Sequence, residues 1–119
     1  MKTNVNVLGT VYRIEIRNKA DDKYLSEQSV EGYCSEDAKL IVLDNLKDIP
    51  DYVLTDAEKE NHIKSTLRHE LVHAFLNESG LSWSANQFGN AWAKNEEMVD
   101  WFAIQSPKIF EAFRQVECI

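Results

Sequence analysis

The stretch Arg68-His69-Glu70-Leu71-Val72-His73-Ala74-Phe75 decides how this chain of 119 residues is organised. A helical pattern runs through it on both sides, and residues four apart on an α-helix lie on one face. His69 and His73 can therefore point at a common atom, and two neutral imidazoles at that spacing make half of a tetrahedral zinc site. Glu70 lies near the same face, where it can reach a water held by the metal and take its proton.

The helix that carries these residues has clear start and stop signals. Thr55-Asp56-Ala57-Glu58 has the Thr-x-x-Glu form of a capping box, which predicts a start near Asp56, and Gly80 supplies a C-terminal stop. Its apolar stripe comprises Ile63, Leu67, Leu71 and Ala74. We therefore predict a helix over residues 56–79.

Strand signals precede this helix. Apolar and polar residues alternate from Tyr12 to Ile16 within residues 4–17, and residues 33–35 form a possible short strand. Residues 39–44 predict another strand, in which 40–43 form either the exposed edge of the sheet beside the helix or a central strand. The predicted fold is α+β and zincin-like. A small, mostly antiparallel N-terminal sheet packs on the active-site helix, and two further helices follow in a single domain, residues 1–119.

Two helices are predicted after the active-site helix. Residues 81–90 are rich in Ser, Asn and Gly and predict a loop anchored by Trp83 and Phe88. A second helix is expected over about 91–105. Pro107 then interrupts it and starts a last helix over 107–116, because proline disfavours helix in the preceding residue and starts helices well. Ile109, Phe110 and Phe113 are expected to pack against the core.

Composition narrows the function classes. The net charge of −7 argues against nucleic-acid binding, because proteins that bind nucleic acids normally carry a basic face. No apolar run is long enough for a membrane span, and the N-terminal run is too short for a signal peptide, so we predict a cytoplasmic protein. Cys34 and Cys118 do not form a framework and are expected to be free thiols. Cys34 is interpreted as a small, half-buried strand residue rather than a metal ligand.

Two histidines leave zinc needing a third protein ligand and an open position for water. Asn95-Glu96-Glu97-Met98-Val99-Asp100 lies on the next predicted helix, where Glu96 and Asp100 are four residues apart. One carboxylate can bind the metal while the other orients a ligand histidine through its free ring N–H. Taken alone, this pattern is also that of an acidic helix face balanced by Lys94 or Arg68. Glu97 is the rival of Glu96, but the four-residue step to Asp100 favours Glu96.

His69-Glu70-x-x-His73 followed by Asn95-Glu96-x-x-x-Asp100 resembles the gluzincin metallopeptidase pattern of thermolysin-like enzymes. The resemblance implies a zinc metallopeptidase with His69, His73 and Glu96 as ligands. It implies Glu70 as general base and Asp100 as the partner of His69. The segments Leu8-Gly9-Thr10-Val11-Tyr12, Gly32-Tyr33-Cys34, Arg68-His69-Glu70 and Glu96–Ala103 also resemble small zinc-peptidase-like proteins of bacteriophages and prophages. On that basis we expect a phage or prophage protein located in the host cytoplasm.

One departure from the pattern affects the functional prediction. Full-size gluzincins add a second domain with a Tyr or His that stabilises the tetrahedral oxyanion, and this chain has no room for one. Tyr33, Tyr52 and His62 are the local candidates. We predict hydrolysis of a peptide or protein substrate by a zinc-bound water that Glu70 activates, with no nucleic-acid or membrane partner. The alternative is a non-catalytic, zinc-stabilised binding or regulatory protein that keeps the zincin fold.

Overall fold

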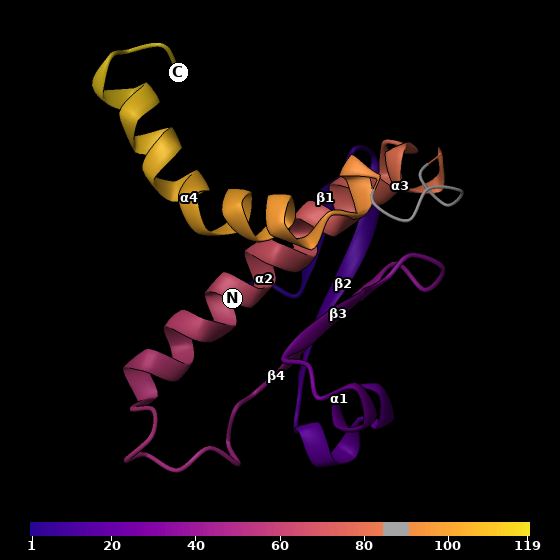
Figure 1. Cartoon of the computed structure of the whole chain (residues 1–119), viewed down its shortest axis with the longest axis vertical. Helices are drawn as coiled ribbons and strands as arrows, with labels where there is room; N and C mark the ends of the chain where they lie inside the picture. Colours follow the sequence, from indigo (N-terminus) through magenta and orange to yellow (C-terminus); the bar gives the residue numbers. More distant parts are fainter. Residues whose placement is uncertain (85–90) are drawn as a thin grey trace.

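The computed structural model describes residues 1–84 and 91–119, with strands in the first part of the chain and the long helices in the second (Figure 1). The strands are β1 (Asn4–Val7), β2 (Thr10–Arg17), β3 (Gly32–Ser35) and β4 (Leu40–Asp44). The helices are α1 (Lys23–Gln28), α2 (Asp56–Glu78), α3 (Leu81–Ser84) and α4 (Glu96–Gln115), with short 3-10 turns η1 (Lys19–Asp21) and η2 (Trp92–Lys94). The predicted α+β class is confirmed.

The four strands form one mixed sheet in the order β1-β2-β4-β3. β1 and β2 make an antiparallel hairpin whose two turn residues, Leu8 and Gly9, have φ of 51° and 94°, the left-handed region that a tight hairpin turn needs. β4 pairs in parallel with β2 and antiparallel with β3. The prediction that Leu40–Leu43 is a central strand is therefore confirmed, and the alternative of an exposed edge is wrong. The edge beside α2 is β3.

The sheet is covered on both faces. α2 packs on one face, where its predicted stripe of Ile63, Leu67, Leu71 and Ala74 contacts a core of Val7, Tyr12, Ile14, Ile41 and Leu43. On the other face, α1 contributes the buried Leu25 to a smaller cluster with Leu40 and Val42. Because both faces are covered, β4 is buried along its whole length, which explains its continuous apolar run.

The ends of α2 are set by the signals found in the sequence. The Thr55 side chain accepts from the backbone N–H of Glu58, and the Glu58 carboxylate accepts from the backbone N–H of Thr55, so both halves of the capping box form. Gly80 follows the helix with φ of 82°. The predicted helix over 56–79 is thus confirmed to within one residue, and it holds His69 and His73 in its C-terminal half.

The predicted break at Pro107 is wrong, because α4 runs through it as one helix. Proline lacks the N–H that would bond to the carbonyl of Ala103, four residues earlier. Arg68 of α2 replaces this missing donor, since Arg68 Nε donates to Ala103 O at 2.7 Å. A contact from a neighbouring helix therefore satisfies the carbonyl that Pro107 leaves free, and it ties α4 to α2 one residue before His69.

The region after α2 differs from the prediction in other ways. Residues 81–84 form the single turn of α3 rather than a loop, and Phe88 lies outside the described residues. Among the described residues after α2, this turn and the 3-10 turn η2 precede α4, which begins at Glu96 and not near residue 91 as predicted. Beyond Pro107, α4 projects away from the sheet (Figure 1), and Phe110 and Phe113 are 42% and 40% exposed rather than packed in the core. Among the described residues, no helix is both long and apolar enough to cross a bilayer.

Candidate metal centre

α2 presents His69, Glu70 and His73 toward α4 and the sheet edge. The two imidazoles meet edge to face with ring centroids 4.8 Å apart, and their Nε2 atoms are 3.1 Å apart. This is the arrangement that their four-residue spacing predicts. Burial lowers the pKa of His73, which favours the neutral imidazole, the form that binds a metal.

Glu96 reaches both imidazoles from α4. It is the first residue of that helix, which Asn95 caps by accepting from the backbone N–H of Met98 at 2.8 Å. The Glu96 carboxylate oxygens lie 3.1 Å from His69 Nε2 and 3.2 Å from His73 Nε2. The adjacency of Asn95 and Glu96 in the sequence thus has a local cause. Asn95 caps the N-terminus of α4, and Glu96, as the first residue of this helix, is held in position by that cap.

These three side chains fit a zinc ion. Donor atoms at about 2.0–2.1 Å from a tetrahedral zinc lie about 3.3 Å from one another. The separations among His69 Nε2, His73 Nε2 and the Glu96 oxygens are 3.1–3.3 Å. Glu70 also places a carboxylate oxygen in the cluster, but it is 4.0 Å from His69 Nε2. Glu96 is therefore the better third ligand, and Glu70 is left beside the site.

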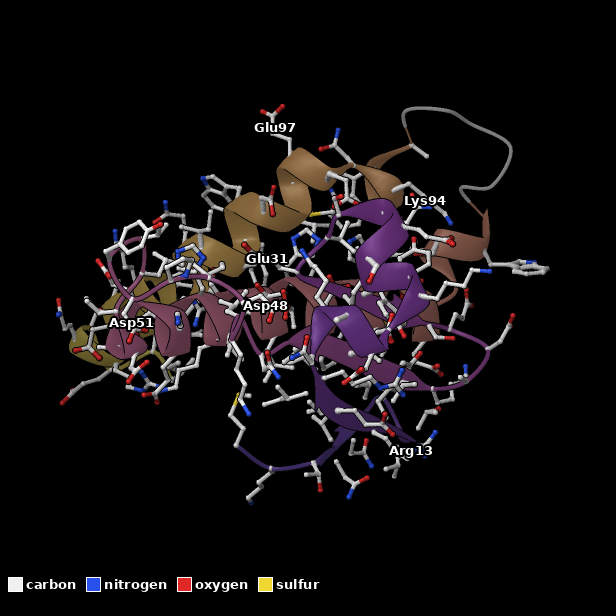
Figure 2. The ribbon with its side chains drawn as sticks, turned by 90° about the horizontal axis from the view of Figure 1, so that it is seen from below. Arg13, Glu31, Asp48, Asp51, Lys94 and Glu97 are labelled. Carbon is white, nitrogen blue, oxygen red and sulfur yellow. The ribbon has the colours of Figure 1, made fainter. Side chains whose placement is uncertain are left out.

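Asp100 fixes the orientation of His69. Its Oδ1 lies 2.7 Å from His69 Nδ1, so the ring can donate from Nδ1 and keep the lone pair of Nε2 for a metal. Glu97, the rival of Glu96, forms no contact with the histidines and points away from the protein body in Figure 2. The structure thus brings together all five residues proposed from the sequence, and it separates Glu96 from Glu97.

Glu70 is the most unusual carboxyl group of the site. Its residue is 6% exposed, and within the described part of the chain its carboxylate accepts no hydrogen bond. Burial raises the pKa of Glu70 from its ordinary 4.5 to about 7; the charge of His69 opposes this rise, and the charges of Glu96 and Asp100 add to it. Its oxygens are not sealed from solvent, because no fully buried side-chain oxygen among the described residues lacks a hydrogen-bond partner. A water or a substrate in the adjacent cavities can therefore reach this carboxylate.

Two cavities meet at this cluster and form one groove. The first, of about 360 Å³, extends toward Thr66, Ala103 and Glu31. The second, of about 520 Å³, extends toward Tyr24, Glu36 and Lys94. Both are lined by Val30 and Gly32 beside the sheet edge and by His69, Glu70 and Glu96. We call this combined space the β3 groove, because the edge strand β3 runs along it.

Gly32 sets how closely β3 approaches α2. A Cβ atom at Gly32 would lie 2.6 Å from Thr66 Cγ2 and 3.1 Å from the carbonyl oxygen of Val42. The first distance is shorter than real Cβ contacts and the second is tighter than most, so a larger residue would force Thr66 of α2, and to a lesser degree β4, to shift. The glycine thus keeps the free edge of the sheet within reach of the site.

The three candidate oxyanion donors are not placed for that role. The Tyr33 hydroxyl donates to Asp22 Oδ2 at 2.9 Å and accepts from Arg17 at 3.3 Å, so both its donor and its acceptor functions are already used. Tyr52 is 90% exposed, and His62 lines neither cavity of the β3 groove. The groove is lined instead by two donors that sequence reasoning missed, Tyr24 and Lys94. Lys94 directly precedes the Asn95-Glu96 pair, and that adjacency is the one sequence signal that could have indicated it.

Cys34 lies in β3 and lines the second cavity. Burial raises the pKa of its thiol to about 12, and Asn77 Nδ2 donates to its sulfur at 3.8 Å. A metal ligand must be a thiolate, which this environment disfavours. The half-buried strand position agrees with the interpretation from the sequence.

Comparison with known proteins yields no match to a protein-family model, a curated protein or a solved structure.

Proposed function

We propose that this protein is a zinc-dependent metallopeptidase with a minimal zincin-like, gluzincin-type site. The observation that carries the proposal is the pairing of two features in one groove. His69 Nε2, His73 Nε2 and Glu96 Oε2 converge at separations close to those that zinc requires. Beside them, 4.0 Å from His69 Nε2, lies a largely buried carboxyl group that accepts no hydrogen bond from the described residues. A purely structural metal site does not need the second feature.

Each residue has a role in this proposal. His69, His73 and Glu96 hold the zinc, which when bound polarises the scissile carbonyl and activates water. Asp100 orients His69 through the 2.7 Å contact to Nδ1. Glu70 accepts the proton of the attacking water and later passes it to the leaving amine. Its position supports this role, because its carboxylate lies beside the ligand atoms, 4.0 Å from His69 Nε2, and lines both cavities.

The substrate is proposed to be an extended peptide bound along β3. β3 pairs with β4 on one side only, so its other edge has backbone groups free to add a strand. The β3 groove runs beside that edge and passes over the cluster. A strand added there would bring its backbone carbonyls past Glu70.

The test is cleavage of a random-sequence peptide mixture, followed by mass spectrometry. We expect the zinc-loaded protein to cleave, the chelated protein not to cleave, and added zinc to restore cleavage. Glu70→Gln should abolish cleavage while retaining zinc, and Glu97→Gln, a matched change at an exposed carboxylate, should leave both unchanged. Equal cleavage by the wild type and Glu70→Gln would reject the proposal.

One observation favours a second candidate, a non-catalytic binding or regulatory protein stabilised by zinc. The ligands come from two helices, with His69 and His73 on α2 and Glu96 on α4. A metal there would cross-link the two helices. A melting temperature that collapses with chelator, together with no hydrolysis of any peptide, would support this candidate instead.

A further inference from the structure

We propose that Lys94 is the oxyanion-stabilising residue of this site. This inference rests on the proposed hydrolytic function. Lys94 ends the η2 turn, two residues before Glu96, and Figure 2 shows it where the chain enters α4. It lines the second cavity together with His69, Glu70, His73 and Glu96.

Elimination of the other donors that line the β3 groove supports this assignment. Tyr33 is committed to Asp22, Thr66 donates to the carbonyl of His62 at 3.0 Å, and Asn77 donates to Cys34. Tyr24 and two serines, Ser65 and Ser82, also line the groove, but their hydroxyls carry no charge. Apart from the histidines of the cluster, Lys94 is the sole cationic side chain in the described lining.

Lys94 is also available. Its Nζ forms no ion pair or hydrogen bond with any residue that the structure describes. Glu36 lines the same cavity and forms no ion pair with Lys94 in the described part of the chain. An ammonium group with three donors on a flexible stem can therefore turn toward a charge that develops in the groove.

The reaction creates such a charge. When the water oxygen adds to the carbonyl carbon, the π pair moves to the carbonyl oxygen, which becomes an oxyanion, and the water proton goes to Glu70. The oxyanion accepts a hydrogen bond from Lys94 Nζ. The oxyanion then returns its electron pair to re-form the C=O bond as the C–N bond breaks. The C–N electron pair goes to nitrogen, and Glu70 returns the proton to that nitrogen, which gives a carboxylic acid and an amine. Removal of one preorganised oxyanion donor typically lowers kcat by about 10²–10³. Lys94 is exposed and must turn toward the charge, so the lower end of this range is the expected loss.

The experiment compares Lys94→Met, Lys94→Arg and a matched control, Lys108→Met, on the exposed part of α4. Two small ligands serve as probes of the zinc-loaded protein. N-phosphoryl-leucinamide carries a tetrahedral anion like the intermediate, and acetohydroxamate binds zinc without one. Calorimetry gives the affinity of each, and the peptide mixture gives kcat and KM.

For Lys94→Met we expect a kcat lower by about 10² with a nearly unchanged KM. The phosphoryl ligand should lose affinity, while zinc content and acetohydroxamate affinity stay the same. Lys94→Arg should recover part of both losses, and Lys108→Met should match the wild type.

Unchanged affinity for the phosphoryl ligand in Lys94→Met would overturn the assignment. So would a change confined to KM for peptides with a free C-terminal carboxylate, which would make Lys94 a substrate anchor. The proposed function fails separately, by the absence of zinc or of any cleavage in the wild type. The phosphoryl affinity still decides the role of Lys94 if the wild type binds zinc but cleaves nothing.

Discussion

Glu70 and Glu78 lie on the same helix, α2, but their carboxylates differ in hydrogen bonding and in the direction of their pKa shifts. Glu70 is buried beside the metal cluster without a hydrogen-bond donor, and its pKa is raised to about 7. Glu78, two turns later, accepts hydrogen bonds from Thr10, Tyr12 and Lys39 at 2.7–2.9 Å, and these bonds lower its pKa to about 2. Glu78 thus receives its hydrogen bonds from the protein itself, whereas Glu70 accepts none from the described residues and can accept one from a water or a ligand.

This difference follows from where the sheet places its donors. Glu78 faces the start of β2 and the residue before β4, so the hairpin and the sheet are joined to the end of α2 there. Glu70 faces the β3 groove, where its neighbours are histidines and other carboxylates. The first arrangement ties the end of α2 to the sheet, and we propose that the second provides the general base of the site.

The largest expected effect comes from making the same Glu→Gln substitution at each of the two positions. Glu70→Gln should lower peptide cleavage by about 10²–10⁴, the usual contribution of a general base, while thermal unfolding changes little. Glu78→Gln should leave cleavage intact. If Glu78→Gln lowered cleavage as much as Glu70→Gln at a temperature where both are folded, the separation of roles would be wrong.

The second effect concerns Asp100. Asp100→Asn weakens the group that orients His69 and should lower zinc affinity by about 10–100-fold. Competition with a chromogenic chelator measures it. Glu97→Gln is the control, since both changes remove one negative charge from α4. Equal losses in the two variants would mean that overall charge, and not the contact to His69, controls affinity.

The third effect tests the junction between α2 and α4. Arg68→Met leaves Ala103 O without its donor, because Pro107 cannot supply one, and should cost about 1–3 kcal/mol in the free energy of unfolding. Pro107→Ala restores a helical N–H four residues after Ala103. Urea unfolding should therefore show a smaller cost for Arg68→Met in the Pro107→Ala background. Strictly additive costs would contradict the contact.

The fourth effect is the loss of the Glu78 bonds. Glu78→Ala leaves the buried Tyr12 hydroxyl without its acceptor and should lower the melting temperature by on the order of 5 °C. Tyr12→Phe removes that hydroxyl, so Glu78→Ala should cost less in its background. A cost that is the same in both backgrounds would show that Tyr12 is not the group affected.

The smallest expected effect is the loss of the stabilisation by Glu78 at acidic pH. The folded pKa of Glu78 is depressed below its ordinary 4.5 by the bonds from Lys39, Tyr12 and Thr10. Its stabilisation is therefore fully present above about pH 4.5 and is lost as pH falls toward about 2. Urea midpoints measured across this range should show the gap between the wild type and Glu78→Gln narrowing below pH 4.5. A gap independent of pH would show that the charge of Glu78 is not responsible.

Local rules predicted much of this protein. The capping box placed the start of α2, and the four-residue spacings placed His69 near His73 and Glu96 near Asp100. Contacts between distant segments decided the rest. α4 continues through Pro107 because Arg68 contacts Ala103 O, 35 residues away. β4 is central because β2 and β3 pair on its two sides. No periodicity in the sequence records either contact, and the same holds for the arrangement that brings Tyr24 and Lys94 into one cavity.

The central claim is that His69, His73 and Glu96 form one zinc site, and X-ray absorption spectroscopy of the purified protein with elemental analysis tests it directly. We predict one equivalent of zinc bound by two imidazole nitrogens and carboxylate oxygen at about 2.0–2.1 Å. His73→Ala, Glu96→Ala or both should remove it. A protein that retains no zinc, or a zinc bound through the sulfur of Cys34, would contradict the account.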